Sequence, residues 1–536
     1  MAQPLRDGRQ AAARFAGQFA LIAVFLILLH APLLRLPYFW DEAGYFIPAA
    51  RDLLLTGDPI PQSTLSNAHP PLVAAYLALA WTLAGFSPLV TRMAMLVVAA
   101  LALVGVFRLG KKVAHPEVAA VATVLTGLYP VFFMQSVMAH LDLAAAALTV
   151  WGLLFYLERR MAGAAALLGL AALAKETAIV TPLALVAWEM YCRGRGRKTW
   201  LPEDNASAGG ARVLLLLLAA VPLAVWLAYH GQRTGHVLGN PEYVRYNVTA
   251  TLDAGRMGLA ALRRLWQVTG HMHLFVLTAA AALAMFRPAI GDNGAERQRI
   301  ALPVQRVFAV VAAAHVAMLS VIGGAALARY MLPVAPLVIL VCVSTLRRRM
   351  RRWRMAAAAA GVAFALGWFV EPPYPIAPED TLAWRDYVEL HQGAAVAVAA
   401  RYPQARVLTA WPATDELTRP YLGYVGAPLR VLALEDFSPQ QMAIAARDNH
   451  WYDVALVFST KYEPRRNLLR RVPGWERAEM RYFGYHRDVQ PQAAAALVGG
   501  RVVLEGRRGG EWVAVIEVER VRNAGKSEAD KESRGD

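Results

Sequence analysis

Two adjacent carboxylates, Asp41 and Glu42, follow directly on a long apolar segment near the start of this chain. Carboxylates at a water–membrane boundary can simply be the solvated end of a helix. Alternatively, such a group acts as a general base toward a hydroxyl group, or orients that hydroxyl. Aromatic residues lie on both sides of the pair, from Tyr38 to Phe46, and would shield it from water. The segment is therefore a first candidate for a reaction centre.

A second candidate is the run His69-Pro70-Pro71. The two prolines restrict the backbone and keep the residue before them extended. The run is either the entry into a helix, with proline in its first turn, or a rigid turn that holds His69 beside Asp41.

Four further residues carry charge or a hydroxyl group where the chain is otherwise apolar. Asp142 lies a few residues inside an apolar segment, where an ionised group is costly and functional by default; it is a surface acid if the helix begins later. Lys175 is a cation among Ala, Leu and Val, so we expect it to pair with Asp142 or to bind a phosphate. Arg329 and Tyr330 open another apolar segment, either as interfacial anchors or as ligands of a lipid phosphate.

Neither a metal site nor a nucleotide site is apparent in the sequence. His271 and His273 are two residues apart, a spacing that does not place both on one face of a helix. Asp41 and Asp142 could share a divalent cation, although so few oxygen ligands do not define one. The sequence has no Walker loop and no glycine fingerprint. We therefore assign no cofactor and leave a divalent cation open.

The elements that must position these residues are membrane helices. The chain has 536 residues, of which 57% are hydrophobic and only 18% are charged, whereas soluble proteins carry about a quarter charged residues. The net charge of +16 comes from short Lys and Arg clusters between apolar runs. This pattern is typical of cytoplasmic loops under the positive-inside rule, and it argues against nucleic-acid binding, which needs a continuous basic face.

Eleven spans satisfy both hydropathy and the positive-inside rule. We predict them at about 15–36, 88–108, 113–134, 139–157, 162–175, 177–191, 212–230, 269–287, 304–326, 330–346 and 355–370. Residues 71–86 are apolar enough to span, but counting them would place basic clusters on the wrong side, so we interpret them as an interfacial helix. Residues 162–190 could form one long helix; a hairpin broken at Lys175 satisfies the charge rule instead.

Three domains follow from this division. Residues 1–370 form the transmembrane domain, with the N-terminus cytoplasmic. After the stiff, proline-rich linker that begins at Glu371, residues 371–522 alternate strand-like and helical runs, which predicts a small extracytoplasmic α/β domain. Strands are expected at 406–410, 429–434, 453–459, 501–504 and 512–518, and helices at 414–422 and 439–447. Residues 523–536 form a charged tail, predicted to be disordered.

The ordered set of motifs over about residues 15–350 resembles the GT-C membrane glycosyltransferases. The set comprises Asp41-Glu42, the His-Pro-Pro-Leu run at 69–72, Asp142, the short hairpin with Lys175, and the Arg-Tyr-x-x-Pro-x-x-Pro run at 329–336. It is most similar to the bacterial branch resembling dolichyl-phosphate-mannose protein mannosyltransferases and lipid A aminoarabinose transferase. Near the Pro-Pro turn the latter enzymes carry Glu-Lys, whereas this chain has Ala68-His69, so the resemblance does not imply the acceptor.

The resemblance implies an inverting transferase in a bacterial inner membrane, with a sugar donor linked to polyprenyl phosphate. The acceptor would be an extracytoplasmic lipid A, another glycan or lipid, or a protein hydroxyl group. Asp41, Glu42 and Asp142 would be the acids of the site; His69, Lys175, Arg329 and Tyr330 would bind the donor and its phosphate. Two other functions stay open at this point, a transporter or flippase of a lipid-linked sugar and a non-catalytic scaffold. A transporter usually places its polar residues near the midplane of the membrane, whereas here they gather at the predicted outer ends.

Overall fold

The computed structural model describes residues 2–195, 206–292, 295–464 and 466–519. The predicted tail at 523–536 and part of the basic cluster at 193–198 lie outside these residues. The chain divides into two compact units. The helical unit comprises Met1–Arg35, Tyr45–Pro372 and Glu379–Thr381, and the α/β unit comprises Leu36–Gly44, Pro373–Pro378 and Leu382–Asp536. Each unit is described by itself below.

The α-helices of the helical unit are α1 (Ala2–His30), α2 (Ile47–Thr56), α3 (Leu72–Ala84), α4 (Pro88–Val113), α5 (Pro116–Leu128), α6 (Pro130–Gln135), α7 (Leu141–Leu157), α8 (Met161–Ala174), α9 (Val180–Gly194), α10 (Ala206–Leu218), α11 (Val221–Thr234), α12 (Pro241–Asn247), α13 (Ala254–Thr269), α14 (Leu274–Met285), α15 (Leu302–Val321), α16 (Ala335–Arg349) and α17 (Trp353–Leu366). Two antiparallel strands of two residues each, β1 (Gly291–Asp292) and β2 (Ala295–Glu296), lie between α14 and α15 in the sequence. Proline stands at the first position of α4, α5, α6 and α12, where its missing N–H and fixed φ angle suit a helix start.

Each predicted span has a helix, or a pair of consecutive helices, in the structure. Among the described residues, five segments are long and apolar enough to cross a membrane by length and composition: Ala12–Leu33, Pro88–Val113, Gly210–Thr234, Ala254–Met285 and Leu302–Val321. Large apolar side chains on the helices are exposed, including Leu28 and Leu283, as a surface that faces lipid requires. The chain is thus a multi-pass membrane protein, and the count of eleven spans stays a prediction.

The predicted hairpin at 162–191 is confirmed. The apolar run is interrupted at Lys175, whose backbone is extended between α8 and the 3₁₀ turn η3 (Glu176–Ile179). Lys175 meets Asp142 at the start of α7, whereas Tyr156 near the end of α7 donates a hydrogen bond to Glu189 of α9. Helix α8 therefore runs toward Asp142, and α9 returns in the opposite direction.

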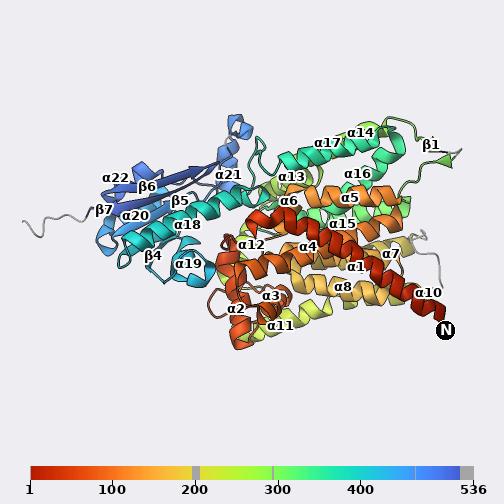
Figure 1. The fold of residues 1–536 in the computed structure, drawn as a ribbon, viewed down its shortest axis with the longest axis horizontal. Coiled ribbons are helices and arrows are strands. Elements are labelled where there is room, and N and C mark those ends of the chain that lie inside the picture. The colour runs from red at the N-terminus through yellow and green to blue at the C-terminus, as the bar shows by residue number, and fades with distance from the viewer. Residues whose placement is uncertain (1, 196–205, 293–294, 465, 520–536) are drawn as a thin grey trace, which may run out of the picture. The chain divides into compact units, whose positions relative to one another are not determined.

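Helices α2 and α3 differ from the helices around them. Figure 1 shows α4, α5 and α8 running in one common direction, with α2 across it. Helix α3 is 13 residues long, roughly 20 Å, and it contacts the first two turns of α4. Tyr76 donates to the Ala94 carbonyl group, and Trp81 donates to the Thr91 hydroxyl group. The interfacial interpretation of residues 71–86 stays a prediction.

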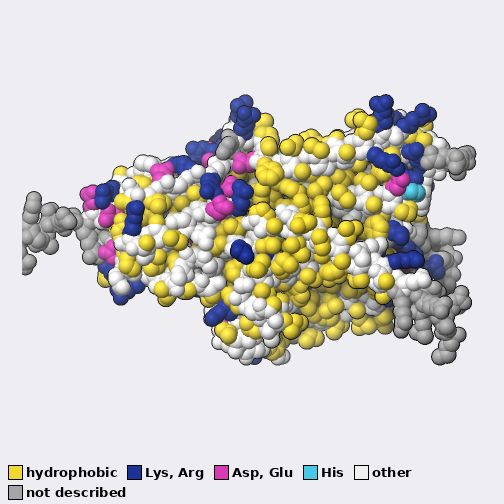
Figure 2. Space-filling view, in the orientation of Figure 1, with side chains coloured by type: hydrophobic (Ala, Val, Ile, Leu, Met, Phe, Trp, Pro, Cys, Tyr) yellow, Lys and Arg dark blue, Asp and Glu magenta, His cyan; other side chains and the backbone are white. Residues whose placement is uncertain are grey.

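The basic clusters gather at one end of the helical unit. Figure 2 shows Lys and Arg at the end where β1 and α10 lie, with hydrophobic side chains covering the helices beside it. Arg354 and Arg347 pair with Glu117, which brings the turn between α4 and α5 to the end of α16. Asp142, Lys175 and Arg329 stand at the opposite ends of α7, α8 and α16. The helical unit therefore has a basic end and a second end that carries the candidate site residues.

The α/β unit holds a five-stranded sheet in the order β4-β3-β5-β7-β6. Its strands are β3 (Arg406–Ala410), β4 (Arg430–Leu434), β5 (Val454–Phe458), β6 (Gly500–Arg508) and β7 (Glu511–Val518), and its α-helices are α18 (Ala383–Arg401), α19 (Ala413–Thr418), α20 (Pro439–Arg447), α21 (Trp475–Phe483) and α22 (Pro491–Val498). Strands β4, β3 and β5 are parallel, whereas β7 and β6 are antiparallel to their neighbours.

The predicted strands of this unit are confirmed, with boundaries that differ by at most a few residues. The parallel order of the first three follows from the helices between them, because parallel strands need a crossover connection. The central strand β5, Val-Ala-Leu-Val-Phe, is buried at every position. A continuous apolar run of this kind is typical of a strand covered on both faces.

Candidate active site

Asp142 forms the centre of a buried charged cluster at the non-basic end of the helical unit. It lies in the first turn of α7, and only 4% of its surface is exposed. Its Oδ1 is 2.5 Å from the Nζ of Lys175, and its Oδ2 is 3.3 Å from the Nε of Arg329. The start of a helix favours an anion there, and the two cations compensate the buried charge. The structure thus brings together three residues that are far apart in the sequence.

Tyr330 is surrounded by cations. The Nζ of Lys175 lies 3.8 Å from the centre of its ring, and the guanidinium carbons of Arg264 and Arg329 lie at 5.3 and 5.7 Å. A cation within about 6 Å of an aromatic face is attracted by the ring quadrupole. Both Arg329 and Tyr330 come from the 3₁₀ turn η6 (Ala328–Met331), which places the two side chains in the same cluster.

Arg264 of α13 is a site residue that the sequence analysis missed. It is fully buried, and it donates hydrogen bonds to the side chain of Gln267 and to the carbonyl groups of Leu319 and Leu327. Within the part of the chain that the structure describes, its Nη2 has no hydrogen-bond acceptor. Arg264 follows Arg263 in an amphipathic helix, so the sequence alone indicates a charged residue on the solvated face. Only the fold shows that it points inward.

Glu379 is a second residue that the sequence analysis missed. It lies in the 3₁₀ turn η7 (Pro378–Asp380), which the sequence assigned to the linker and α/β domain but which returns to the helical unit. Its Oε2 is 2.5 Å from the Nη1 of Arg329. The next residue, Asp380, lies 3.0 Å from the Nε2 of His271. The Pro-Glu-Asp sequence within a proline-rich stretch was the only signal for this return.

The cluster gathers three cations around the ring of Tyr330. Its cations are Lys175, Arg264 and Arg329, and its carboxylates are Asp142 and Glu379. Burial makes an unsatisfied polar group expensive, so the Nη2 of Arg264, which has no acceptor among the described residues, favours an anionic ligand. Guanidinium groups suit phosphate oxygens because their planar donors bind two oxygens at once.

His69 lies next to this cluster, in contact with Glu176. The Nδ1 of His69 is 3.1 Å from the Oε2 of Glu176, the residue that follows Lys175. Burial raises the pKa of Glu176, but attraction by His69 and Lys175 outweighs this effect and sets that pKa at about 2. Glu176 is therefore ionised at neutral pH. The predicted placement of His69 beside Asp41 stays a prediction.

Asp41 and Glu42 belong to the α/β unit rather than to the helical unit. Glu42 is buried at the start of a π-helical turn, η2 (Glu42–Phe46), and its carboxylate accepts a hydrogen bond from the Phe39 N–H at 2.9 Å. Asp41, just before this turn, is partly exposed. Glu42 thus stabilises the backbone of its own loop, and the catalytic roles of both residues stay predictions.

The residues that the structure describes do not form a metal centre. Among the described residues, the structure has no group of three or more His, Cys, Asp or Glu placed to hold a metal ion. Both oxygens of Asp142 already lie near cations. A divalent cation at Asp142 would therefore have to compete with Lys175 and Arg329.

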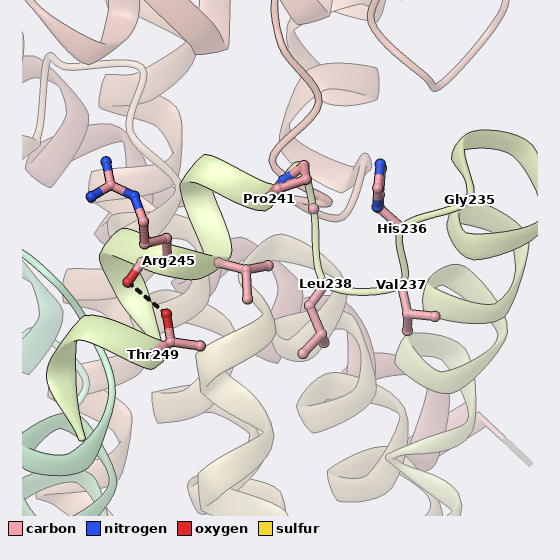
Figure 3. A pocket seen from close by; sticks show the side chains of 9 residues that line it. Gly235, His236, Val237, Leu238, Pro241, Arg245 and Thr249 are labelled. Atoms are coloured by element: carbon pink, nitrogen blue, oxygen red, sulfur yellow. Dashed lines mark hydrogen bonds between the residues drawn. The ribbon is translucent and has the colours of Figure 1, made fainter.

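Two hollows border the helical unit. A shallow one of about 440 Å³ lies along the loop between α11 and α12, between Gly235 and Thr249 (Figure 3), and it contains none of the predicted site residues. A narrower cleft lies between α2, the following loop and α3, and it reaches His69 and Leu141, the neighbour of Asp142. Of these two hollows, the second is the one lined by a predicted site residue, His69.

One family model matches part of the chain. Residues 68–226, less than a third of the chain, match the family model described as dolichyl-phosphate-mannose-protein mannosyltransferase. The match includes His69, Asp142 and Lys175. No curated protein sequence matches the chain significantly.

The fold is similar to that of a solved structure, ArnT from Cupriavidus metallidurans. ArnT from Cupriavidus metallidurans bound to undecaprenyl phosphate is 15% identical, with a TM-score of 0.56 over 95% of this chain and 99% of that one. Its apo state gives 15% identity, a TM-score of 0.55, and coverage of 94% and 98%. The chain resembles the GT-C membrane glycosyltransferases. This confirms the predicted resemblance and the predicted fold class, a polytopic helical protein with a C-terminal α/β domain.

Proposed function

We propose that this protein is an inverting glycosyltransferase that moves a sugar from a polyprenyl-phosphate-linked donor to an extracytoplasmic acceptor. The observation that carries the proposal is the buried cation cluster around Tyr330. Such a cluster suits a phosphate group that gains negative charge when it leaves. The ArnT that shares the fold was solved with undecaprenyl phosphate bound, which supports this class of lipid for the present chain.

The reaction needs no nucleotide. The acceptor oxygen attacks the anomeric carbon of the sugar from the side opposite the phosphate, and the bond between that carbon and the phosphate oxygen breaks. The bonding electrons go to the phosphate, which departs as a polyprenyl phosphate monoester. The acceptor proton passes to a carboxylate, for which Asp41 is the predicted base. Inversion follows from a single displacement.

Cations provide the other half of the chemistry. Lys175, Arg264 and Arg329 would stabilise the charge that develops on the departing phosphate, and groups fixed in advance for this purpose lower the barrier. Asp142 contacts two of these cations, so its proposed role is to hold them in place. His69 and Glu176 lie beside Lys175 and would position it from the other side.

The charge distribution supports an orientation for this activity. Under the positive-inside rule, the basic end of the helical unit faces the cytoplasm of a bacterial inner membrane. The charged cluster at the other end then faces the extracytoplasmic side, and the α/β domain, residues 371–522, is extracytoplasmic as well.

Purified full-length protein in detergent, supplied with radiolabelled polyprenyl-phosphate sugars, tests the proposal directly. Mass spectrometry of co-purifying lipids first identifies which donor to supply. We expect transfer to an extracytoplasmic glycan, lipid or peptide hydroxyl group, and loss of that transfer in Arg329→Gln. The Arg349→Gln variant is the control, because Arg349 lies at the basic end. Transport of the intact lipid-linked sugar in proteoliposomes without any transfer would refute the proposal.

A further inference from the structure

The loop that carries Asp41 is built into the α/β unit, although it follows the first helix in sequence. Residues Leu36–Gly44 cluster with this unit, whose other residues begin at Pro373. The hydroxyl group of Tyr424 donates a hydrogen bond to the Tyr38 carbonyl group at 2.9 Å. The Leu422 carbonyl group accepts from the Tyr38 N–H at 3.5 Å. The start of the loop is thus fixed by residues nearly four hundred positions away.

Aromatic side chains of the α/β unit enclose the residue before Asp41. The ring of Trp40 makes edge contacts with the rings of Tyr387 and Trp411, each with centres 5.5 Å apart. Phe39 contacts the edge of Tyr387 at 5.2 Å. Such aromatic pairs have preferred geometries and contribute beyond the area that they bury. The Trp40 side chain is therefore held in a cage of rings.

The backbone at this point requires such support. Trp40 has a φ angle of +42°, a left-handed conformation that non-glycine residues rarely adopt. The chain continues into the π-helical turn η2, a rare form that occurs frequently at functional sites. Unusual backbone conformations persist only where their surroundings enforce them. Here the surroundings are residues of the α/β unit.

Gly44 and α19 complete the arrangement. A Cβ atom added to Gly44 would lie 2.5 Å from the indole ring of Trp411, so only glycine permits this close approach. The carboxylate of Asp415 accepts a hydrogen bond from the Trp411 side chain. The next residue, Glu416, lies 2.7 Å from His391, whose ring stacks on Tyr387 at 3.8 Å. Two neighbouring acids of α19 thus hold the two rings that contact Trp40.

We infer that the C-terminal α/β domain acts as the positioning element for the Asp41 carboxylate, with Trp411 and Tyr387 as positioning residues. The inference rests on the proposed function, in which Asp41 serves the acceptor. It assigns to this domain a part in the transfer step rather than in donor binding. Both rings contact Trp40 and would act through the loop.

The Trp411→Ala variant of the full-length protein tests the inference, with Trp411→Phe as the conservative partner. Displacing a catalytic group by about 1 Å can cost about 100-fold in rate. We expect Trp411→Ala to lower kcat by about 10- to 100-fold, with the Kd for undecaprenyl phosphate unchanged within about twofold. Trp411→Phe keeps a ring in the cage and should recover most of the rate. Trp451→Ala, a half-exposed tryptophan of the same unit, is the matched control.

A double-mutant cycle separates positioning from general stability. If Trp411 acts through Asp41, Trp411→Ala should add little to the loss already caused by Asp41→Asn, since residues that act as a unit are not additive. Multiplicative losses, an unchanged kcat, or an equal loss of undecaprenyl phosphate binding would each overturn the inference. If Trp411→Ala fails to fold, Tyr424→Phe removes only the hydrogen bond to Tyr38 and should give a smaller loss of the same kind.

Hydrogen exchange measures the placement without relying on activity. Amides 38–46 should lose protection in Trp411→Ala and keep it in Trp451→Ala, while α4 stays protected in both. This result is expected even if wild-type protein transfers no sugar from any polyprenyl phosphate, an outcome that would refute the proposed function alone. Unchanged protection of 38–46 in Trp411→Ala would refute the inference alone.

Discussion

Asp142 and Asp41 are both acids that follow an apolar stretch of sequence, but different forces hold them. Asp142 is buried in the helical unit, and two cations from distant segments neutralise it. Asp41 is partly exposed in the α/β unit, on a loop that aromatic rings and a hydrogen bond to Tyr38 keep in an unusual conformation. The placement of Asp142 therefore depends on charge balance, and the placement of Asp41 depends on packing. Substitutions should therefore affect stability at Asp142 and rate at Asp41.

The largest effect is expected at Asp142. Asp142→Asn leaves Lys175 and Arg329 buried with one carboxylate fewer, and breaking such a buried pair costs about 3–5 kcal/mol. Unfolding of the purified protein in detergent, followed by heat or denaturant, measures this loss. The double variant Asp142→Asn/Lys175→Met removes both charges and should recover part of the stability. A single variant as stable as the wild type would contradict the charge-balance account.

Asp41→Asn should show the opposite pattern. As the predicted general base it should lower the transfer rate by about 100- to 1000-fold, with little change in the unfolding midpoint. Steady-state transfer assays with a fixed donor measure the rate. Glu42→Gln is the matched control, because Glu42 accepts the Phe39 N–H and a glutamine oxygen can do the same. Equal losses in the two variants would show that Asp41 has no special role.

Glu379 tests the charge balance of the Asp142 cluster, because it contacts Arg329. Its carboxylate occupies a donor of that guanidinium group, so it repels an incoming phosphate. Glu379→Gln should tighten the binding of undecaprenyl phosphate about five- to tenfold, roughly 1 kcal/mol. Calorimetric titration measures the Kd, and Asp380→Asn serves as the neighbouring control. Weaker binding would instead mean that Glu379 mainly holds Arg329 in position.

The smallest effect is expected for the pair His69 and Glu176. The side chains of His69 and Glu176 are 21% and 28% exposed, and ion pairs in contact with water contribute less than about 1 kcal/mol. Glu176→Gln and His69→Gln, alone and combined, give the coupling energy from unfolding midpoints. A coupling well above 1 kcal/mol would place this pair with the Asp142 cluster rather than at its margin.

Much of the fold could be predicted because its signals are local. Apolar length and the Arg and Lys clusters located the helices, and the run Val454–Phe458 located a buried strand. The site was predictable where a charge interrupts an apolar segment, as at Asp142 and Lys175. Arg264 and Glu379 lie in segments that are polar anyway, so nothing local distinguishes them from surface residues. Their inward orientation depends on long-range packing, which the sequence pattern does not reveal.

The α/β unit contains chain segments that lie far apart in the sequence. This has a consequence for synthesis of the protein. Chains are made from the N-terminus at about 5–20 residues per second, and domains generally fold as units in that order. Residues 36–44 leave the ribosome hundreds of residues before their partners Tyr387, Trp411 and Tyr424. The Asp41 loop must therefore wait, exposed, while the membrane helices are inserted. A nascent chain that still lacks Tyr387, Trp411 and Tyr424 would not yet hold its predicted base in place, so it would be unable to start transfer.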